Sequence, residues 1–164
     1  MSGSELASVY LVDLSRDGLH WATAKALGYV DYPSDSVEAG AYWYLDPSKA
    51  PFCARIRKSD WQPTLDWRQA GELLQKFIMR LGLSGNPIHT FDNPPSDKRY
   101  YATAYAGPLS QLGCTDFGPD YPTAICRAVV KEKFGDPMRI PESLLESLIN
   151  PAEPVGTALP TGDL

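Results

Sequence analysis

The stretch TLDWRQAGELLQKFIMRLG, residues 64–82, carries the clearest secondary-structure signal in the chain. Its apolar residues recur every three or four positions, as on one face of an α-helix, and Gly82 stands where such a helix would end. Asp66, or Thr64 before it, is suited to cap the free N–H groups of the first turn. The periodicity predicts a core-facing stripe of Trp67, Ala70, Leu73, Leu74, Phe77, Ile78 and Leu81.

Three further helices are predicted. Residues 10–29 have the pattern of a short strand that runs into a helix, with Ser15 as the N-cap and Gly28 at the C-terminal end. Residues 121–135 begin with a proline in the first turn and end at a glycine, which is the usual asymmetry of helix ends. Residues 141–148, PESLLESL, predict a short final helix.

The strands are expected to pair as antiparallel hairpins. Residues 41–46 and 52–58 flank the turn signal DPSKAP, and two more strands are predicted at 88–91 and 100–106, with a loop at 107–120. Since side chains alternate along a strand, Trp43 and Leu45 are assigned to the core. The opposite face is then expected to expose two tyrosines and two arginines, and Tyr101, Thr103 and Tyr105 to lie opposite three alanines.

These elements predict an α+β protein in which helices pack on a small, mainly antiparallel sheet. A chain of 164 residues fits one domain, which we place at residues 1–149. Residues 150–164 hold three prolines and few large apolar groups, so we expect a flexible tail.

Composition narrows the classes of function. A net charge of -5 and a pI near 4.9 argue against general nucleic-acid binding, because phosphate binding needs clustered Lys and Arg. The three cysteines are far apart and form no C-x-x-C pair, which favours a reduced intracellular setting. No segment approaches the length of a membrane span, so we expect a soluble, cytoplasmic protein.

The familiar spacings of catalytic and metal sites are missing from the sequence. His20 and His89 lie 69 positions apart without a metal-binding motif, and there is no phosphate-binding glycine loop or nucleophile elbow. We therefore predict no catalytic residue, no metal and no cofactor. An acid and base pair that assembles only in space stays open.

An aromatic and basic surface is the most informative feature that remains. Flat rings can stack on a base, and guanidinium groups fit phosphate or carboxylate, so the surface suits a small anionic aromatic ligand. Trp61 lies outside the helical period and is expected to face this ligand. Two alternatives are a solvated sheet face, on which Tyr and Arg merely pair, and a protein interface. The predicted ligand-binding residues are Tyr42, Tyr44, Arg55, Arg57, Trp61, Arg99 and Tyr101.

Three stretches together resemble the NinX-like family of bacteriophage proteins. They are LSRDGLHWATAKALGY (14–29), SDWQPTLDWRQAGELL (59–74) and YPTAICRAVVKEKFGDPMRIPE (121–142). The resemblance implies phage origin and an accessory role in the cytoplasm of an infected bacterium. It supplies no catalytic residues to carry over.

The surface and the resemblance together give the expected function. We expect a non-enzymatic anti-defence sponge that binds and sequesters a small nucleotide-like host signalling molecule. Oligomerisation of identical subunits would turn a shallow face into a closed pocket. The alternatives are a phage inhibitor that binds a host protein through the same aromatics and, less favoured, a nucleotide hydrolase.

Overall fold

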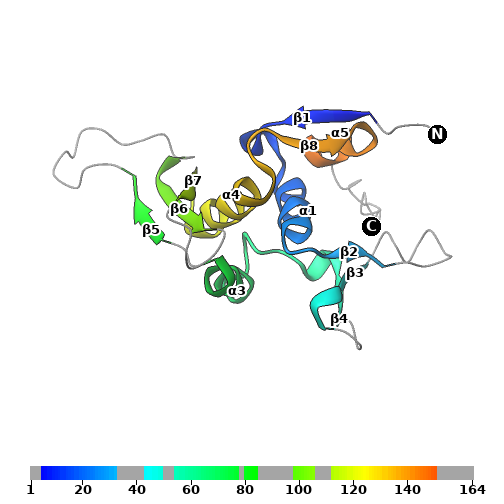
Figure 1. Ribbon diagram of the computed structural model, residues 1–164, viewed down its shortest axis with the longest axis horizontal. Coiled ribbons are helices and arrows are strands. Elements are labelled where there is room, and N and C mark those ends of the chain that lie inside the picture. Colours follow the sequence, from blue (N-terminus) through cyan, green and yellow to red (C-terminus); the bar gives the residue numbers. More distant parts are fainter. Residues whose placement is uncertain are drawn as a thin grey trace, which may run out of the picture.

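The computed structural model describes residues 5–32, 43–49, 54–77, 80–84, 98–105 and 112–150. In these residues it confirms the α+β class: four α-helices and three small antiparallel sheets pack together in one compact body (Figure 1). The strand predicted at 88–91, Tyr42 and residues 151–164 of the predicted tail lie outside the described residues.

Helix α4 (Tyr121–Phe134) lies at the centre of the largest group of packed elements (Figure 1). Its N-cap is Asp120, whose side chain accepts a hydrogen bond from the Thr123 N–H at 2.7 Å. The predicted end at Gly135 is confirmed, with φ at 81°. The helix is buried on nearly every side through Pro122, Ala124, Ile125, Cys126, Ala128, Val129 and Val130.

Helix α1 (Arg16–Ala26) packs against α4 and against the C-terminal helix α5 (Glu142–Ile149). The predicted N-cap is confirmed, since Ser15 Oγ accepts from the Gly18 N–H at 3.0 Å. The same hydroxyl donates to the Leu148 carbonyl at 2.7 Å. A side chain at position 18 would collide with that carbonyl, so glycine allows the close approach of α5.

Helix α3 (Trp67–Phe77) is shorter than predicted and ends before the next strand. Residues 80–83 form strand β5 (Arg80–Leu83), in which Leu81 pairs with Ala102 instead of continuing the helical stripe. Pairing with a neighbouring strand has here overridden local helix propensity. Ala70, Leu73 and Phe77 are buried as expected. The prediction that Trp67 faces the core is wrong, because Trp67 is 56% exposed.

The β5–β6–β7 sheet lies against α4. Strand β6 (Tyr100–Tyr105) confirms the predicted strand and its faces, with Ala102 and Ala104 fully buried. Strand β7 (Gly113–Gly118) lies in the stretch that we predicted as a loop. Its glycines and aspartate resemble turn residues, but the segment pairs with β6 along its whole length.

The β2–β3–β4 sheet consists of β2 (Val30–Asp31), β3 (Trp43–Asp46) and β4 (Ala54–Arg57). The β3–β4 hairpin is confirmed, and β4 has its predicted faces, with Arg55 and Arg57 exposed, but the predicted faces of β3 are inverted. Tyr44 pairs with Ile56 on the inner side, where it joins Tyr29, Trp61 and Ala24 in a small second core. Because Trp43, Tyr44 and Leu45 are all large and apolar in character, the period of two could not select a face.

A third sheet joins the two ends of the described chain. Strand β1 (Leu6–Val9) pairs with β8 (Met138–Pro141), and neither was predicted at these bounds. Residues 11–13, expected as a strand, form the 3-10 helix η1 (Leu11–Asp13). Of two other 3-10 helices, η2 (Pro47–Lys49) lies in the connection between β3 and β4, and η3 (Lys58–Asp60) follows β4.

The two tryptophans of residues 59–71 should differ sharply in their effect on stability. Trp61→Ala should lower the free energy of unfolding by about 3–5 kcal/mol, because it empties the small second core. Trp67→Ala should lower it by less than about 1 kcal/mol, since the ring lies mostly in solvent. Urea unfolding followed by circular dichroism measures both, and a Trp67 variant as unstable as the Trp61 variant would contradict this assignment.

Candidate functional site

The residues predicted to bind a ligand do not form one surface. Trp61 is 3% exposed and Tyr44 is 4% exposed, so both rings are core and neither presents a face to solvent. The Trp61 ring meets Tyr29 edge-on at 5.2 Å, and its Nε1 donates to the His20 carbonyl at 2.9 Å. The expectation of an open Trp61 ring is therefore wrong.

Arg55 and Arg57 are exposed, but Tyr44 points away from them. The Arg55 guanidinium lies 4.5 Å from the Tyr32 ring centre and donates to its hydroxyl at 2.8 Å. The Arg57 guanidinium lies 5.2 Å from the ring centre of Trp43. Both cations are thus paired with rings of the same chain, as the alternative of a solvated sheet face expects.

Arg99 and Tyr101 lie elsewhere, next to and within the β5–β6–β7 sheet. Tyr101 packs against Phe117 at 6.3 Å between ring centres, on the face opposite the buried alanines. Arg99 lies 5.9 Å from the ring centre of Tyr100, which belongs to the other face. Arg99 therefore neighbours an aromatic group that the sequence did not single out.

That aromatic group consists of Trp67, Tyr100 and Tyr121. The rings of Tyr100 and Tyr121 meet edge-on at 4.6 Å, and the Trp67 ring centre lies 6.5 Å from that of Tyr121. They line a shallow hollow of about 410 Å³, which we call the aromatic groove. Its lining is completed by Thr64, Leu65, Asp120 and Pro122.

The position of Trp67 explains why its period misled the prediction. It is the first residue of α3, and helical side chains lean toward the N-terminus of their helix. The ring of the first residue therefore extends beyond the part of the helix that packs against the core, even when it lies on the same helical face as the core residues. A tryptophan at a predicted helix start was the available signal for this site.

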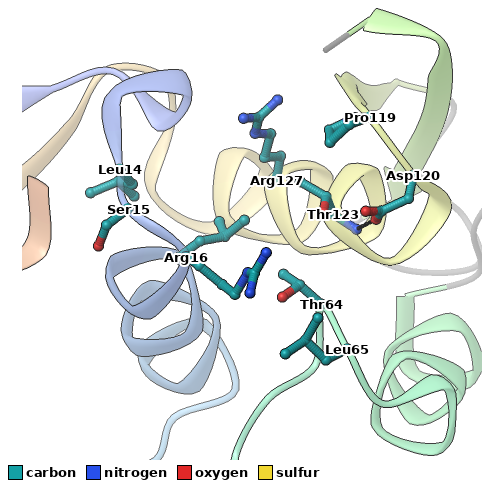
Figure 2. Close-up of a pocket in the computed structure, with 10 residues that line it drawn as sticks. Leu14, Ser15, Arg16, Thr64, Leu65, Pro119, Asp120, Thr123 and Arg127 are labelled. Carbon is teal, nitrogen blue, oxygen red and sulfur yellow. Dashed lines mark hydrogen bonds between the residues drawn. The ribbon is translucent and has the colours of Figure 1, made fainter. Parts of the chain in front are cut away.

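A second hollow of about 190 Å³ adjoins the aromatic groove, and we call it the arginine hollow. The two share Thr64, Leu65 and Asp120. Figure 2 shows Arg16, from the start of α1, and Arg127, from α4, among the side chains gathered around this hollow. A flat aromatic surface and two guanidinium groups thus meet at one place, although not at the place predicted.

Arg127 is held from behind by the neighbouring strand. One of its terminal nitrogens donates to the Phe117 carbonyl at 2.8 Å, while its buried Nε has no hydrogen-bond partner in the described structure. Asp116 lies nearby, and burial raises the pKa of its carboxyl, although the Phe117 amide, Lys131 and Arg127 act in the opposite direction. Lys131 Nζ lies 4.0 Å from Asp116 Oδ2, so the two side chains form an ion pair but are too far apart for a hydrogen bond.

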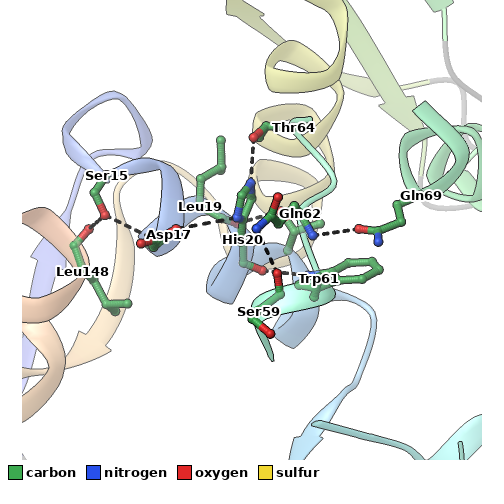
Figure 3. A network of polar contacts seen from close by, with 12 residues as sticks. Ser15, Asp17, Leu19, His20, Ser59, Trp61, Gln62, Thr64, Gln69 and Leu148 are labelled. Atoms are coloured by element: carbon green, nitrogen blue, oxygen red, sulfur yellow. Dashed lines mark hydrogen bonds and ion pairs between the residues drawn. The ribbon is translucent and has the colours of Figure 1, made fainter. Parts of the chain in front are cut away.

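The floor between the two hollows is fixed by a buried polar contact. His20 Nε2 lies 2.6 Å from Thr64 Oγ1, with the donor set by the histidine tautomer (Figure 3). On the other side of the ring, Nδ1 is 3.9 Å from the exposed Asp17 carboxylate. Together with the Trp61 bond to the His20 carbonyl, this contact holds residues 61–64 against α1.

Burial decides the charge of His20. Desolvation lowers its pKa from the ordinary 6.5 to about 4; Asp17 opposes the shift and Arg16 adds to it. The imidazole is therefore neutral at pH 7. Cys126 is likewise inert core, because burial raises the pKa of its thiol to about 12.

The described residues contain no group of three or more His, Cys, Asp or Glu side chains placed to hold a metal ion. None of the helices in this part of the chain is long and apolar enough to cross a membrane.

Comparison with known proteins adds no family. A scan against protein-family models and a search of curated proteins both return no match to the chain. The resemblance to NinX-like phage proteins therefore stays an expectation.

The buried imidazole should make the fold sensitive to mild acid. Above pH 6.5 it is neutral in both the folded and the unfolded chain, but between pH 6.5 and about 4 only the unfolded chain binds the proton. The free energy of unfolding should fall across this window by about 3 kcal/mol on account of His20. Urea unfolding of the wild type and of His20→Gln at several pH values isolates this contribution, because the carboxylates titrate in both proteins. Parallel curves for the two proteins would contradict it.

Proposed function

We propose that the protein binds a small nucleotide-like anion in the aromatic groove and arginine hollow and holds it without converting it. The observation that carries the proposal is the exposed Trp67 ring, which stands in a group of three aromatics beside two arginines. Tryptophan is rarely left this exposed without a partner, because its burial is strongly favourable.

The chemistry of the lining matches such a ligand. A base can stack on the Trp67 or Tyr121 ring, and such stacking contributes about 1–3 kcal/mol per base. Arg16 can offer two parallel N–H donors to phosphate oxygens, and Arg127 can offer the donors of the terminal nitrogen that does not bond the Phe117 carbonyl. The capping side chains already occupy one amide each at the starts of α1 and α4, and we assign anion binding to the guanidinium groups.

The biological role that we propose is sequestration of a host signalling nucleotide in the cytoplasm of an infected bacterium. This role rests on the resemblance to NinX-like phage proteins and on a site that needs stacking and anion recognition only. The aromatic groove is shallow, so a second copy of the chain that covers it would slow the release of the ligand.

A host-protein inhibitor is the second candidate, and one observation favours it. Leu65 is 55% exposed beside Trp67, so the groove has an apolar rim as well as aromatic rings. Interfaces between proteins are enriched in Trp, Tyr and Arg, the residue types gathered here.

A capture experiment separates these functions. The purified protein is incubated with cyclic dinucleotides and ADP-ribose derivatives, filtered, and then heated to release what it has retained. Intact ligand in the heated fraction supports sequestration, and fragments support a hydrolase. Failure to deplete any ligand would rule out the nucleotide proposal and leave the host-protein inhibitor.

Point variants locate the site. Trp67→Ala and Arg16→Ala should each weaken ligand binding about fivefold or more in isothermal titration, since each removes about 1–3 kcal/mol of stacking or phosphate contact. Arg55→Ala is the matched control for Arg16→Ala, because Arg55 is also exposed but lines neither hollow. Loss of binding in the Arg55 variant, with binding retained in the Arg16 variant, would move the site to the β2–β3–β4 sheet.

A further inference from the structure

Asp120 occupies an unexpected place for a site that binds anions. It lines both the aromatic groove and the arginine hollow, and it is the one carboxylate among the described residues that line them. Its side chain is exposed, and it directly precedes Tyr121, one of the three clustered rings. A negative charge here repels a bound phosphate, so the presence of a carboxylate at position 120 needs a reason other than anion binding.

Helix capping alone does not supply that reason. Asp120 Oδ1 accepts the Thr123 N–H at 2.7 Å, but Asn and Ser cap helices about as well and carry no charge. A carboxylate has about four acceptor positions on its two oxygens, so the cap bond leaves most of its capacity unused. Because Asp120 lines both hollows, we expect the remaining positions to be open to a ligand that spans the aromatic rings and the arginines.

We propose that Asp120 makes this site selective for guanine among the nucleotide bases. The inference rests on the proposed function and specifies its ligand class. A base stacked on Trp67 or Tyr121 presents its polar edge along the groove, where Asp120 is the neighbouring acceptor. Guanine offers two adjacent donors on its pairing edge, the ring N1–H and the 2-amino group, and a carboxylate accepts both side by side.

Adenine fits the same carboxylate poorly. Its pairing edge places an acceptor, the ring N1, next to its one amino group, so one carboxylate oxygen would face a lone pair. Such a mismatch is a repulsive element, and repulsion against the wrong partner is an effective source of specificity. Two matched hydrogen bonds to a base discriminate against the wrong base by roughly five- to 150-fold in Kd.

Isothermal titration with the 5′-monophosphates of guanosine, inosine and adenosine tests the inference, together with cyclic di-GMP and cyclic di-AMP. Guanine nucleotides should bind at least about fivefold more tightly than their adenine counterparts. Inosine monophosphate should fall between, because it keeps the N1–H and lacks the 2-amino group. This intermediate rank distinguishes the two hydrogen bonds from a general preference for larger bases.

Asp120→Asn is the decisive variant, because asparagine keeps the helix cap and removes the paired acceptors. The guanine preference should fall to within about threefold of adenine, with an unchanged melting temperature; Asp120→Ser serves the same purpose if the first variant is unstable. A preference that survives both variants, or equal binding of all bases by the wild type, overturns the inference and leaves the proposed function intact. Failure of every nucleotide to bind overturns both.

Discussion

The rest of the structure depends on the burial of α4 on nearly all of its sides. Six consecutive or neighbouring apolar residues, Ala124 to Val130 apart from Arg127, are fully buried, so this helix needs cover from several directions at once. The β5–β6–β7 sheet covers one side, α1 and α3 cover others, and β8 and η1 close the remainder. No single pair of elements could shield it, which explains why elements from both ends and the middle of the described chain surround it.

Local patterns predicted what depends on local chemistry. The ends of α1 and α4 follow from Ser15, Gly28, Pro122 and Gly135, and the structure confirms all four positions. The alternation along β6 likewise predicted that Ala102 and Ala104 are buried, because small residues on one face and larger ones on the other leave little ambiguity. Capping and alternation act within a few residues, so one sequence is enough to read them.

The predictions were wrong where contacts between residues far apart in the sequence determine the structure. The period of α3 continues through Leu81, but pairing with β6 converts those residues to a strand. Trp61 has no local period, yet Tyr29 and the His20 carbonyl, more than thirty positions away, make it core. Trp67 has the period but lies at the helix end, so it faces the groove. The residue types of the predicted surface, Tyr, Trp and Arg, recur in the aromatic groove and the arginine hollow, whereas the residues that were predicted to form that surface lie apart.

Core and groove are coupled through the segment that carries both tryptophans. Trp61 and Thr64 are held from the inside by bonds to His20, and from Thr64 onward the same backbone presents Leu65 and Trp67 to the groove. Because a buried donor or acceptor is costly to leave unpaired, these bonds fix the segment more firmly than exposed contacts could. Trp67, whose ring we propose binds the ligand, thus depends for its position on Trp61, whose ring the sequence predicted to bind it.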